Sequence, residues 1–429
     1  MAVIASLKAD GAEVFGSSNP TIIHPHEIER EYVTEGGVWF FRAQNVRPMA
    51  ISDGDKVFIS AEDAALLDRN RLRNGDIVVT RTGANAGDCA LFYSEEPAMA
   101  SSHTFIVRSE AWSHPYLVAF FNTRHGQAQI MRGRYGAAQP EVAPYYLRTI
   151  LLPRFERKFE ELIEDLFERS RQEKQQAADH LAAAEKTLRH VLGLDTWQPR
   201  EPLTYVRRAS EVAAAGRFDS VYFSPAKTES AAILRRGGSK PLSTYFEPIR
   251  DMVAPDDVET GKRVLNFDVG AAAHPVIDDT SPSVEDFESA KKRFLPGDVI
   301  ISRLRHYLRQ IAVVRTDAAA VALGSSEFIV LRPRSDALPQ EALVLFLRCL
   351  PVQTILKYSQ DGSHHPRFSE EDLLAIPVPD SLLSLAPKLT AAVRTAHTAR
   401  REAQVLLAHA QRAVEVAIDQ GEPVALALL

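Results

Sequence analysis

An internal repeat is the feature that most constrains the fold of this 429-residue chain. The stretch Gly75-Asp-Ile-Val-Val-Thr-Arg81 recurs as Gly297-Asp-Val-Ile-Ile-Ser-Arg303, and Ala90-Leu-Phe92 recurs as Ala312-Val-Val314. Both recurrences have the same spacing of 222 positions. A Gly-Asp turn before β-branched residues is typical of a strand start. Because the stretches recur in order, the sequence predicts two similar strand-rich domains in tandem.

Two further blocks repeat in the same order. Ser101-Ser102 followed by Phe105-Ile-Val-Arg108 matches Ser325-Ser326 followed by Phe328-Ile-Val-Leu-Arg332. In a third block, which ends at Pro153 and Pro379, Gly136, Pro140 and Leu147 match Gly362, Pro366 and Leu373 at a spacing of 226 positions. Gln129-Ile-Met131 in the same block matches Thr354-Ile-Leu356 at a spacing of 225. The repeat therefore extends over each predicted domain.

A long amphipathic pattern follows each repeat. Apolar residues recur at three-four spacing, which is typical of a helix: Phe155, Phe159, Leu162, Leu166, Ala177, Leu181, Ala184, Leu188 and Val191 after the first repeat, and Leu389, Val393, Ala396, Ala399, Ala403, Leu406, Ala410, Ala413 and Ala417 after the second. The first helix, Glu156 to Leu192, would be about 55 Å long, with Gly193 as its C-terminal cap. Since no globular segment flanks either helix, we expect the two to pair antiparallel through an alanine-rich seam. The alternative is that each helix covers its own domain.

Composition excludes several classes of protein. The chain is 45% hydrophobic and 25% charged, which is ordinary for a globular protein. Cys89 and Cys349 are its only cysteines, too few for a disulfide framework or a zinc site, so we expect the reducing cytoplasm and no structural metal. No apolar run approaches the length of a membrane span, and the N-terminus lacks the regions of a secretory signal.

Charge is distributed unevenly along the chain. The formal net charge is −6, whereas nucleic-acid-binding domains are usually basic. Two local clusters are nevertheless basic: residues 124–154 contain five arginines and one glutamate, and residues 300–316 contain four arginines and no acid. A nucleic-acid function would have to depend on these two clusters.

The repeat, with Gly-Asp-Ile-Val-Val-Thr-Arg-Thr-Gly within a domain that precedes a long helix, resembles the specificity subunits of type I restriction-modification systems. Arg217-Phe-Asp219 with Val221-Tyr-Phe-Ser-Pro225 resembles the opening of a recognition domain in that family, whereas residues 1–35 show no such opening. The fold expected is α+β, with two tandem mixed α/β target-recognition domains separated by long helices that pair as an antiparallel coiled coil. The expected boundaries are 1–154 for the first recognition domain, 155–195 for the central spacer helix, 196–380 for the second domain and 381–429 for the C-terminal spacer helix.

The resemblance also implies a function. Each domain would read one half of a bipartite target in double-stranded DNA, and the helices would set the distance between the halves. They would also dock methyltransferase subunits, expected in two copies, and the assembly would include restriction or translocase subunits. Cofactors would belong to those partners, so the chain itself is expected to bind none and to catalyse no reaction.

Candidate DNA-binding residues lie in the loop after the Gly-Asp strand and in the third block. Arginine can bond both guanine acceptors and asparagine both adenine groups, so such residues suit base edges. The candidates are Arg81, Thr82, Asn85, Arg132, Arg134, Tyr135 and Gln139 in the first half, and Arg303, Arg305, His306, Tyr307, Arg309, His364, His365 and Arg367 in the second. The alternative for Arg81 is a solvated turn whose arginine pairs with a nearby acid. In the second repeat, Thr82-Gly83-Ala84-Asn85 is replaced by Leu304-Arg305-His306-Tyr307, so the two loops should prefer different bases.

Other functions remain as alternatives. His364-His365 would suit a metal, but no acidic or cysteine neighbour has ligand spacing. An enzyme with its own recognition domains would need a further catalytic domain, and the chain shows no adenosyl or dinucleotide fingerprint, P-loop or nucleophile elbow. A DNA-reading subunit of another defence complex and a coiled-coil scaffold that binds only proteins both stay open.

Overall fold

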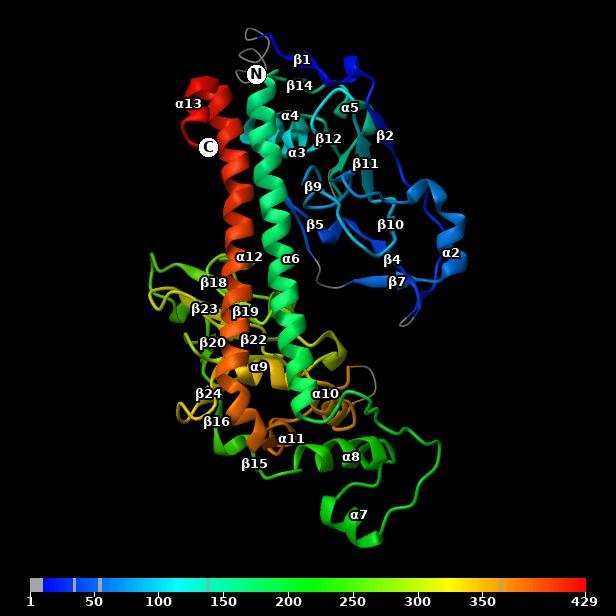
Figure 1. Cartoon of the computed structure of the whole chain (residues 1–429), viewed down its shortest axis with the longest axis vertical. Helices are drawn as coiled ribbons and strands as arrows, with labels where there is room; N and C mark the ends of the chain where they lie inside the picture. Colours follow the sequence, from blue (N-terminus) through cyan, green and yellow to red (C-terminus); the bar gives the residue numbers. More distant parts are fainter. Residues whose placement is uncertain (1–10, 34–35, 53–55, 137–138, 363–364) are drawn as a thin grey trace. The chain divides into compact units, whose positions relative to one another are not determined.

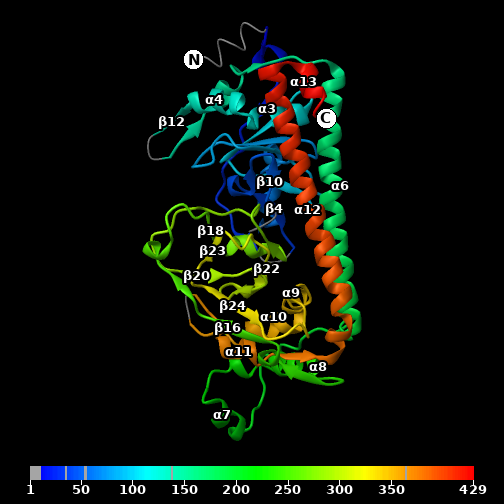
Figure 2. The same cartoon turned by 90° about the vertical axis from the view of Figure 1, so that its left-hand side faces the viewer.

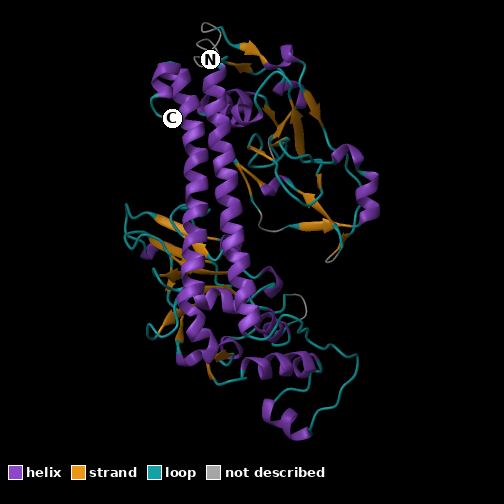
Figure 3. Cartoon of the chain, viewed as in Figure 1, coloured by secondary structure: helices purple, strands orange, loops and turns teal. Residues whose placement is uncertain are grey.

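The computed structural model describes residues 11–33, 36–52, 56–136, 139–362 and 365–429. The chain divides into two compact units, one formed by residues 1–174 and 402–429 and the other by residues 175–401. Each unit combines sheets with helices, which confirms the predicted α+β class (Figure 3). The division passes through two long helices, so each unit contains a part of both (Figure 1).

Two four-stranded sheets form the body of the first unit. The first sheet is antiparallel and has the order β2 (Thr21–Ile23), β11 (Thr104–Arg108), β8 (Ile77–Thr80) and β9 (Cys89–Leu91). The second sheet is mixed and has the order β10 (Ala98–Ala100), β4 (Val38–Phe41), β7 (Val57–Ile59) and β3 (Tyr32–Val33).

The first sheet is buried on both faces, as the alternation of side chains along a strand allows. Val79 and Phe105 face a core that contains helix α3 (His114–Asn122) and the long helices, whereas Val78 and Ile106 face Trp39 of the second sheet. The other strands and α-helices described in this unit are β1 (Glu13–Val14), β5 (Val46–Arg47), β6 (Ala50–Ile51), α2 (Ala61–Leu66), α4 (Arg124–Arg132), β12 (Arg134–Tyr135), β13 (Glu141–Val142), α5 (Pro144–Leu147) and β14 (Leu151–Leu152).

The second unit has the same layers. Its larger sheet has the order β16 (Phe246–Ile249), β24 (Phe328–Pro333), β21 (Val299–Ser302), β22 (Ile311–Val314) and β19 (Val276–Ile277). Its other sheet has the order β17 (Met252–Val253), β20 (Lys291–Phe294), β23 (Val321–Gly324) and β18 (Val264–Phe267). Helices α9 (Gln340–Arg348) and α10 (Leu350–Lys357) cover the larger sheet (Figure 2). The other strands and α-helices described in this unit are α7 (Ala209–Ala215), α8 (Pro225–Leu234), β15 (Ser239–Pro241), α11 (Glu370–Leu374) and β25 (Pro377–Pro379).

The sequence repeat corresponds to repeated hydrogen bonds. Arg81 N donates to His103 O over 2.8 Å, and Arg303 N donates to Glu327 O over 3.1 Å. The structure aligns β24 with β11 one residue differently from the sequence repeat. Phe328 lies opposite Ser302, whereas Thr104 lies opposite Thr80, the equivalent of Ser302, so Phe328 corresponds to Thr104. The sequence-based alignment of Phe105 with Phe328 is therefore wrong by one residue.

A buried ion pair is also repeated. Arg108 Nε lies 2.6 Å from Asp76 Oδ1 in the first unit, and Arg332 Nε lies 2.8 Å from Asp298 Oδ1 in the second. The aspartate side chains are only 4% and 1% exposed. Each carboxylate also accepts a backbone N–H three residues before it, so the pair fastens the turn at the strand start to the neighbouring strand.

The two long helices are α6 (Arg157–Val191) and α12 (Asp380–Gln420), and a short helix, α13 (Glu422–Leu426), follows the second. Helix α6 differs from the predicted span by one residue at each end, and Gly193 follows it with a φ of +68°. Gly193 N donates to His190 O and Leu194 N donates to Arg189 O, so the carbonyls at the helix end are satisfied as predicted.

Within each unit the helices lie side by side and antiparallel (Figures 1 and 2). In the first unit, Ser170 Oγ donates to Ala403 O over 2.9 Å, and Glu156 N donates to the carboxylate of Glu422 over 3.1 Å. In the second unit, Ala177 packs against Ala396. Residues 170 and 396 differ by the repeat spacing of 226, and so do residues 177 and 403. The same seam therefore occurs in both units, with the roles of α6 and α12 exchanged.

The premise that no globular segment packs on the helices is wrong. Phe159 and Ala410 lie in one core with Phe105 of the first unit, and Leu188 and Leu389 lie in one core with the second unit's larger sheet. The helices therefore pair and also cover the sheets, which combines the two alternatives. Polar contacts add to this attachment in the second unit, where buried Glu341 accepts from Arg315 and from Arg394 of α12. Burial alone would raise the pKa of Glu341, but these two arginines outweigh it and lower the pKa.

Candidate nucleic-acid interface

The loops that carry the candidate residues have the same backbone course in both units. Thr80 N donates to Asp88 O at the base of one loop, and Ser302 N donates to Gln310 O at the base of the other. Gly83 and Gly87 have φ values of +98° and +104° in the first loop. Arg305 and Arg309, 222 positions further on, have φ values of +47° and +49°. Two arginines thus occupy left-handed positions that glycines occupy in the other repeat.

A left-handed backbone is unfavourable for a residue with a Cβ atom, by about 1 kcal/mol or more relative to glycine. Arg305 and Arg309 are exposed, and among the described residues neither makes a side-chain hydrogen bond or ion pair. Nothing within the unit therefore offsets the unfavourable backbone of these two residues. Residues in such an unfavourable backbone conformation are typical of functional sites.

A hairpin brings the third block against each loop. In the first unit, Glu141 bridges to Thr82 and pairs with Tyr135 across the β12–β13 hairpin. In the second, Arg367 bridges to Leu304 and to Asp361. The two groups of candidates that are far apart in sequence are thus neighbours in each unit.

In the first unit, Arg81 is held from several sides. Its Nε donates to Glu141 Oε1 over 2.6 Å and Nη2 donates to the same oxygen, while Nη1 contacts His24 Nε2 and Ser102 O. Burial and the Arg81 charge lower the pKa of His24. Arg81 therefore pairs with a nearby acid, as the alternative for this residue has it.

The other candidates of the first unit make fewer side-chain contacts than Arg81, and several of them are exposed. Arg134 donates from Nη2 to Gly83 O and Ala84 O, so it supports the loop. Thr82 Oγ1 lies 2.7 Å from His103 Nδ1. The exposed candidates are Asn85, Arg132, Tyr135 and Gln139.

In the second unit, one carboxylate serves two arginines. Glu327 Oε2 accepts from Arg303 Nε over 3.2 Å and from Arg367 Nε over 2.8 Å, and Glu327 Oε1 accepts from Arg367 Nη2 over 2.7 Å. The hydrogen bonds from Arg367, set against the opposing effect of burial, lower the pKa of Glu327. Glu327 is therefore ionised at neutral pH.

The remaining candidates of the second unit surround this set. Tyr307 and His365 are exposed, as are Arg305 and Arg309. His306 is half-buried; burial lowers its pKa, and a hydrogen bond with Gln360 opposes that effect. His364 lies outside the described residues.

The sequence interpretation missed four residues of this arrangement: His24, His103, Glu141 and Glu327. All are in contact with a predicted arginine or its loop. A usable signal was present, because acid and base differ between the repeats at matched positions. Glu141 corresponds to Arg367 at a spacing of 226, and His103 corresponds to Glu327 at 224.

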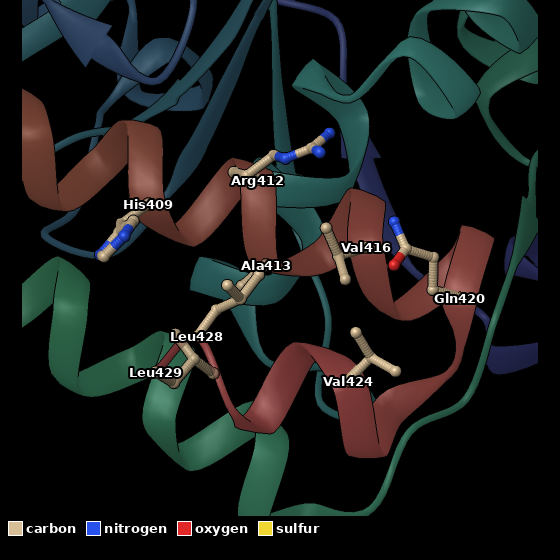
Figure 4. A pocket seen from close by; sticks show the side chains of 8 residues that line it. All are labelled: His409, Arg412, Ala413, Val416, Gln420, Val424, Leu428 and Leu429. Carbon is tan, nitrogen blue, oxygen red and sulfur yellow. The ribbon is translucent and has the colours of Figure 1, made fainter.

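The described part of the chain has a surface hollow but no metal cluster and no membrane-spanning helix. No group of three or more histidine, cysteine, aspartate or glutamate side chains there could hold a metal ion, and no helix there is long and apolar enough to cross a membrane. A hollow in the first unit is formed by α12, α13 and the C-terminal residues (Figure 4), and is lined by His409, Arg412, Ala413, Val416, Gln420, Val424, Leu428 and Leu429. None of the candidate residues lines it.

Comparison with known proteins found neither a matching family model nor a matching curated protein. Among solved structures, the crystal structure of a type I restriction-modification system S subunit from M. genitalium is 12% identical, covers 93% of this chain and 92% of that chain, and has a TM-score of 0.38. The HsdS subunit from Thermoanaerobacter tengcongensis is 15% identical, with 94% and 97% covered and a TM-score of 0.28. A structure from work on complex assembly and conformational transition of the type I R-M system has the same identity and coverage and a TM-score of 0.29. Two of these three descriptions name a type I restriction-modification system, and the other names an HsdS subunit.

Proposed function

We propose that this chain is the DNA-reading specificity subunit of a type I restriction-modification system and that each unit reads one half of a bipartite target. The observation that carries the proposal is the pair of exposed arginines, Arg305 and Arg309, at left-handed positions that are glycines in the other repeat. The unit's own contacts give no reason for this arrangement. A polyanion beside the loop would explain the exposed arginines, because arginine binds phosphate oxygens and guanine edges through several donors at once.

The repeat supports a bipartite target. Two units share a scaffold down to single hydrogen bonds, whereas their loops differ in chemistry: Gly83 and Gly87 are matched by Arg305 and Arg309. A shared scaffold with different loops suits two half-sites of different sequence. The proposed recognition domains are residues 1–154 and 196–380, and the helices of residues 155–195 and 381–429 are the proposed spacer.

The repeated helix seam supports docking of two copies of a partner. Since Ser170–Ala403 in one unit matches Ala177–Ala396 in the other, each unit presents an equivalent helix pair. The proposed partners are methyltransferase subunits, joined by restriction or translocase subunits, and they would supply catalysis and cofactors. The chain itself is proposed to be non-catalytic and to act in the cytoplasm.

The first test replaces both left-handed arginines, as Arg305→Gly with Arg309→Gly. Glycine relieves the backbone, so we expect the free energy of unfolding to be unchanged or to rise by about 1 to 2 kcal/mol. DNA binding should weaken at the same time. Each lost phosphate contact flattens the salt dependence by about one unit, and each lost base contact removes about 1 to 3 kcal/mol of discrimination. The measurements are denaturant unfolding and selection from a pool of random-sequence duplex DNA.

Gly83→Arg in the first unit is the matched control, because it makes the reverse change at the equivalent position. A Cβ at Gly83 meets no atom within 4 Å, so the substitution has only the backbone strain against it. It should destabilise the chain by about 1 kcal/mol and steepen the salt dependence. If the double glycine variant loses stability and binds DNA like the parent, the arginines have a structural role and the proposal is wrong. Absence of salt-dependent DNA binding by the parent chain would instead favour the protein-only scaffold.

A further inference from the structure

We propose that Glu327 is a positioning residue that holds Arg303 as the DNA-reading arginine of the second unit, whereas Glu141 and His24 withdraw the matched Arg81 from that role. The inference rests on the proposed function and deepens it. It predicts which of two equivalent arginines contacts DNA, and why the two units differ. Neither carboxylate belongs to the residues that the sequence singles out.

The matched positions carry different groups. Arg81 and Arg303 are equivalent, since each follows the strand end and donates its backbone N–H to the equivalent carbonyl, His103 O or Glu327 O. The carboxylate that pairs with this arginine lies on a different element in each unit. In the first unit it is on the hairpin, at Glu141, and in the second it is on the turn before β24, at Glu327.

The first arrangement uses all three guanidinium nitrogens of Arg81. Nε and Nη2 both donate to Glu141, and Nη1 contacts His24 and Ser102 O. The side chain is 23% exposed. Glu141 balances its charge, and the donors that would meet a base or a phosphate are already taken. Arg81 is therefore a support for the hairpin.

The second arrangement leaves donors free. Arg303 uses Nε toward Glu327 and is 39% exposed, and within the described residues its two Nη groups have no hydrogen-bond partner. Arg367 takes both oxygens of the same carboxylate. Because one carboxylate cannot balance two arginines, the set keeps an excess positive charge.

This combination suits DNA recognition. A carboxylate that accepts from Nε fixes the plane of the guanidinium, and the free Nη pair can then bond two acceptors at once. In DNA such paired acceptors are O6 and N7 of guanine or two phosphate oxygens, and the first pair gives sequence discrimination. A lysine at the same place would keep the charge and lose the planar set of donors.

The test compares Arg303→Lys with Arg81→Lys in the full chain, using selection from a random-sequence duplex pool and salt titration. Arg303→Lys should lose about 1 to 3 kcal/mol of discrimination at positions within one half-site, which is roughly a 5- to 150-fold change in preference, with the salt dependence kept. Arg81→Lys should leave the selected sequence unchanged. Glu327→Gln should lose the same discrimination while general affinity is kept or raised, since an anion has been removed beside the arginines. Glu327→Asp, which restores the charge, should recover part of the discrimination.

The outcomes separate this inference from the proposed function. If the parent chain selects no sequence at all, the proposed function fails. If the parent selects a bipartite sequence and Arg81→Lys changes it as much as Arg303→Lys does, the inference alone fails. A purely structural role of Glu327 would lower unfolding stability and affinity for all sequences alike. Should Glu327→Gln fold poorly, Arg303→Lys still decides the question, because it keeps the ion pair.

Discussion

Arg332→Ala is expected to lower the free energy of unfolding by about 3 kcal/mol, the usual effect of removing one partner from a buried ion pair. The reason is that the Asp298 side chain is 1% exposed and would lose its cationic partner. Backbone N–H donation from Leu295 would satisfy only part of the carboxylate. Urea unfolding of the variant and the parent measures the difference.

The repeat supplies a matched control for this substitution. Arg108→Ala removes the equivalent partner from Asp76, so the two variants should lose similar stability. Replacing both partners, as Asp298→Asn with Arg332→Met, should recover much of the loss because no uncompensated charge remains. A loss below about 0.5 kcal/mol for both single variants would mean that these pairs are not fixed elements of the scaffold.

Exchanging the loops should change one half of the DNA target. Residues 303–310 and 81–88 are equal in length and both begin with arginine. Both loops are closed by equivalent hydrogen bonds, Thr80 N to Asp88 O and Ser302 N to Gln310 O. A chain with the sequence of 81–88 at 303–310 should therefore fold with stability within about 1 kcal/mol of the parent, because glycine suits the left-handed positions. Its selected DNA should differ from that of the parent in one half-site and agree in the other.

The reverse exchange is the control, and its outcome should be different. It places arginine at Gly87, where a Cβ would lie 2.7 Å from Ile130 Cγ2. We expect a loss of about 1 to 3 kcal/mol from this overlap. If the forward exchange leaves both half-sites unchanged, or alters both, the loops are not the reading elements.

Patterns that depend on local sequence predicted the fold well. The three-four spacing from Phe155 onward gave a helix within one residue of α6 at each end, and Gly193 is its cap. The Gly-Asp turns begin strands β8 and β21 in both repeats. Such elements follow from periodicity and from glycine's access to positive φ, which a single sequence displays.

Features that depend on tertiary contacts were predicted less well. Phe159 and Leu188 carry the same periodicity whether they face another helix or a sheet, so the packing of the helices on the sheets was missed. The partners of Arg81 and Arg303 were missed for a similar reason. Glu141 is 60 residues from Arg81 along the chain, and only the hairpin brings them together. Candidate residues were recognised by type, whereas their partners are decided by the fold.

The proposal that the chain reads a bipartite DNA target is tested most directly by mapping methylated bases in the host genome with and without the gene for this chain. The account predicts a methylated motif of two short specific parts separated by a non-specific spacer, present only with the chain. One part of the motif should change with the loop exchange at 303–310, and the other part should stay the same. A methylation pattern that does not depend on the chain, or a single continuous motif that the exchange leaves unaltered, would contradict the account.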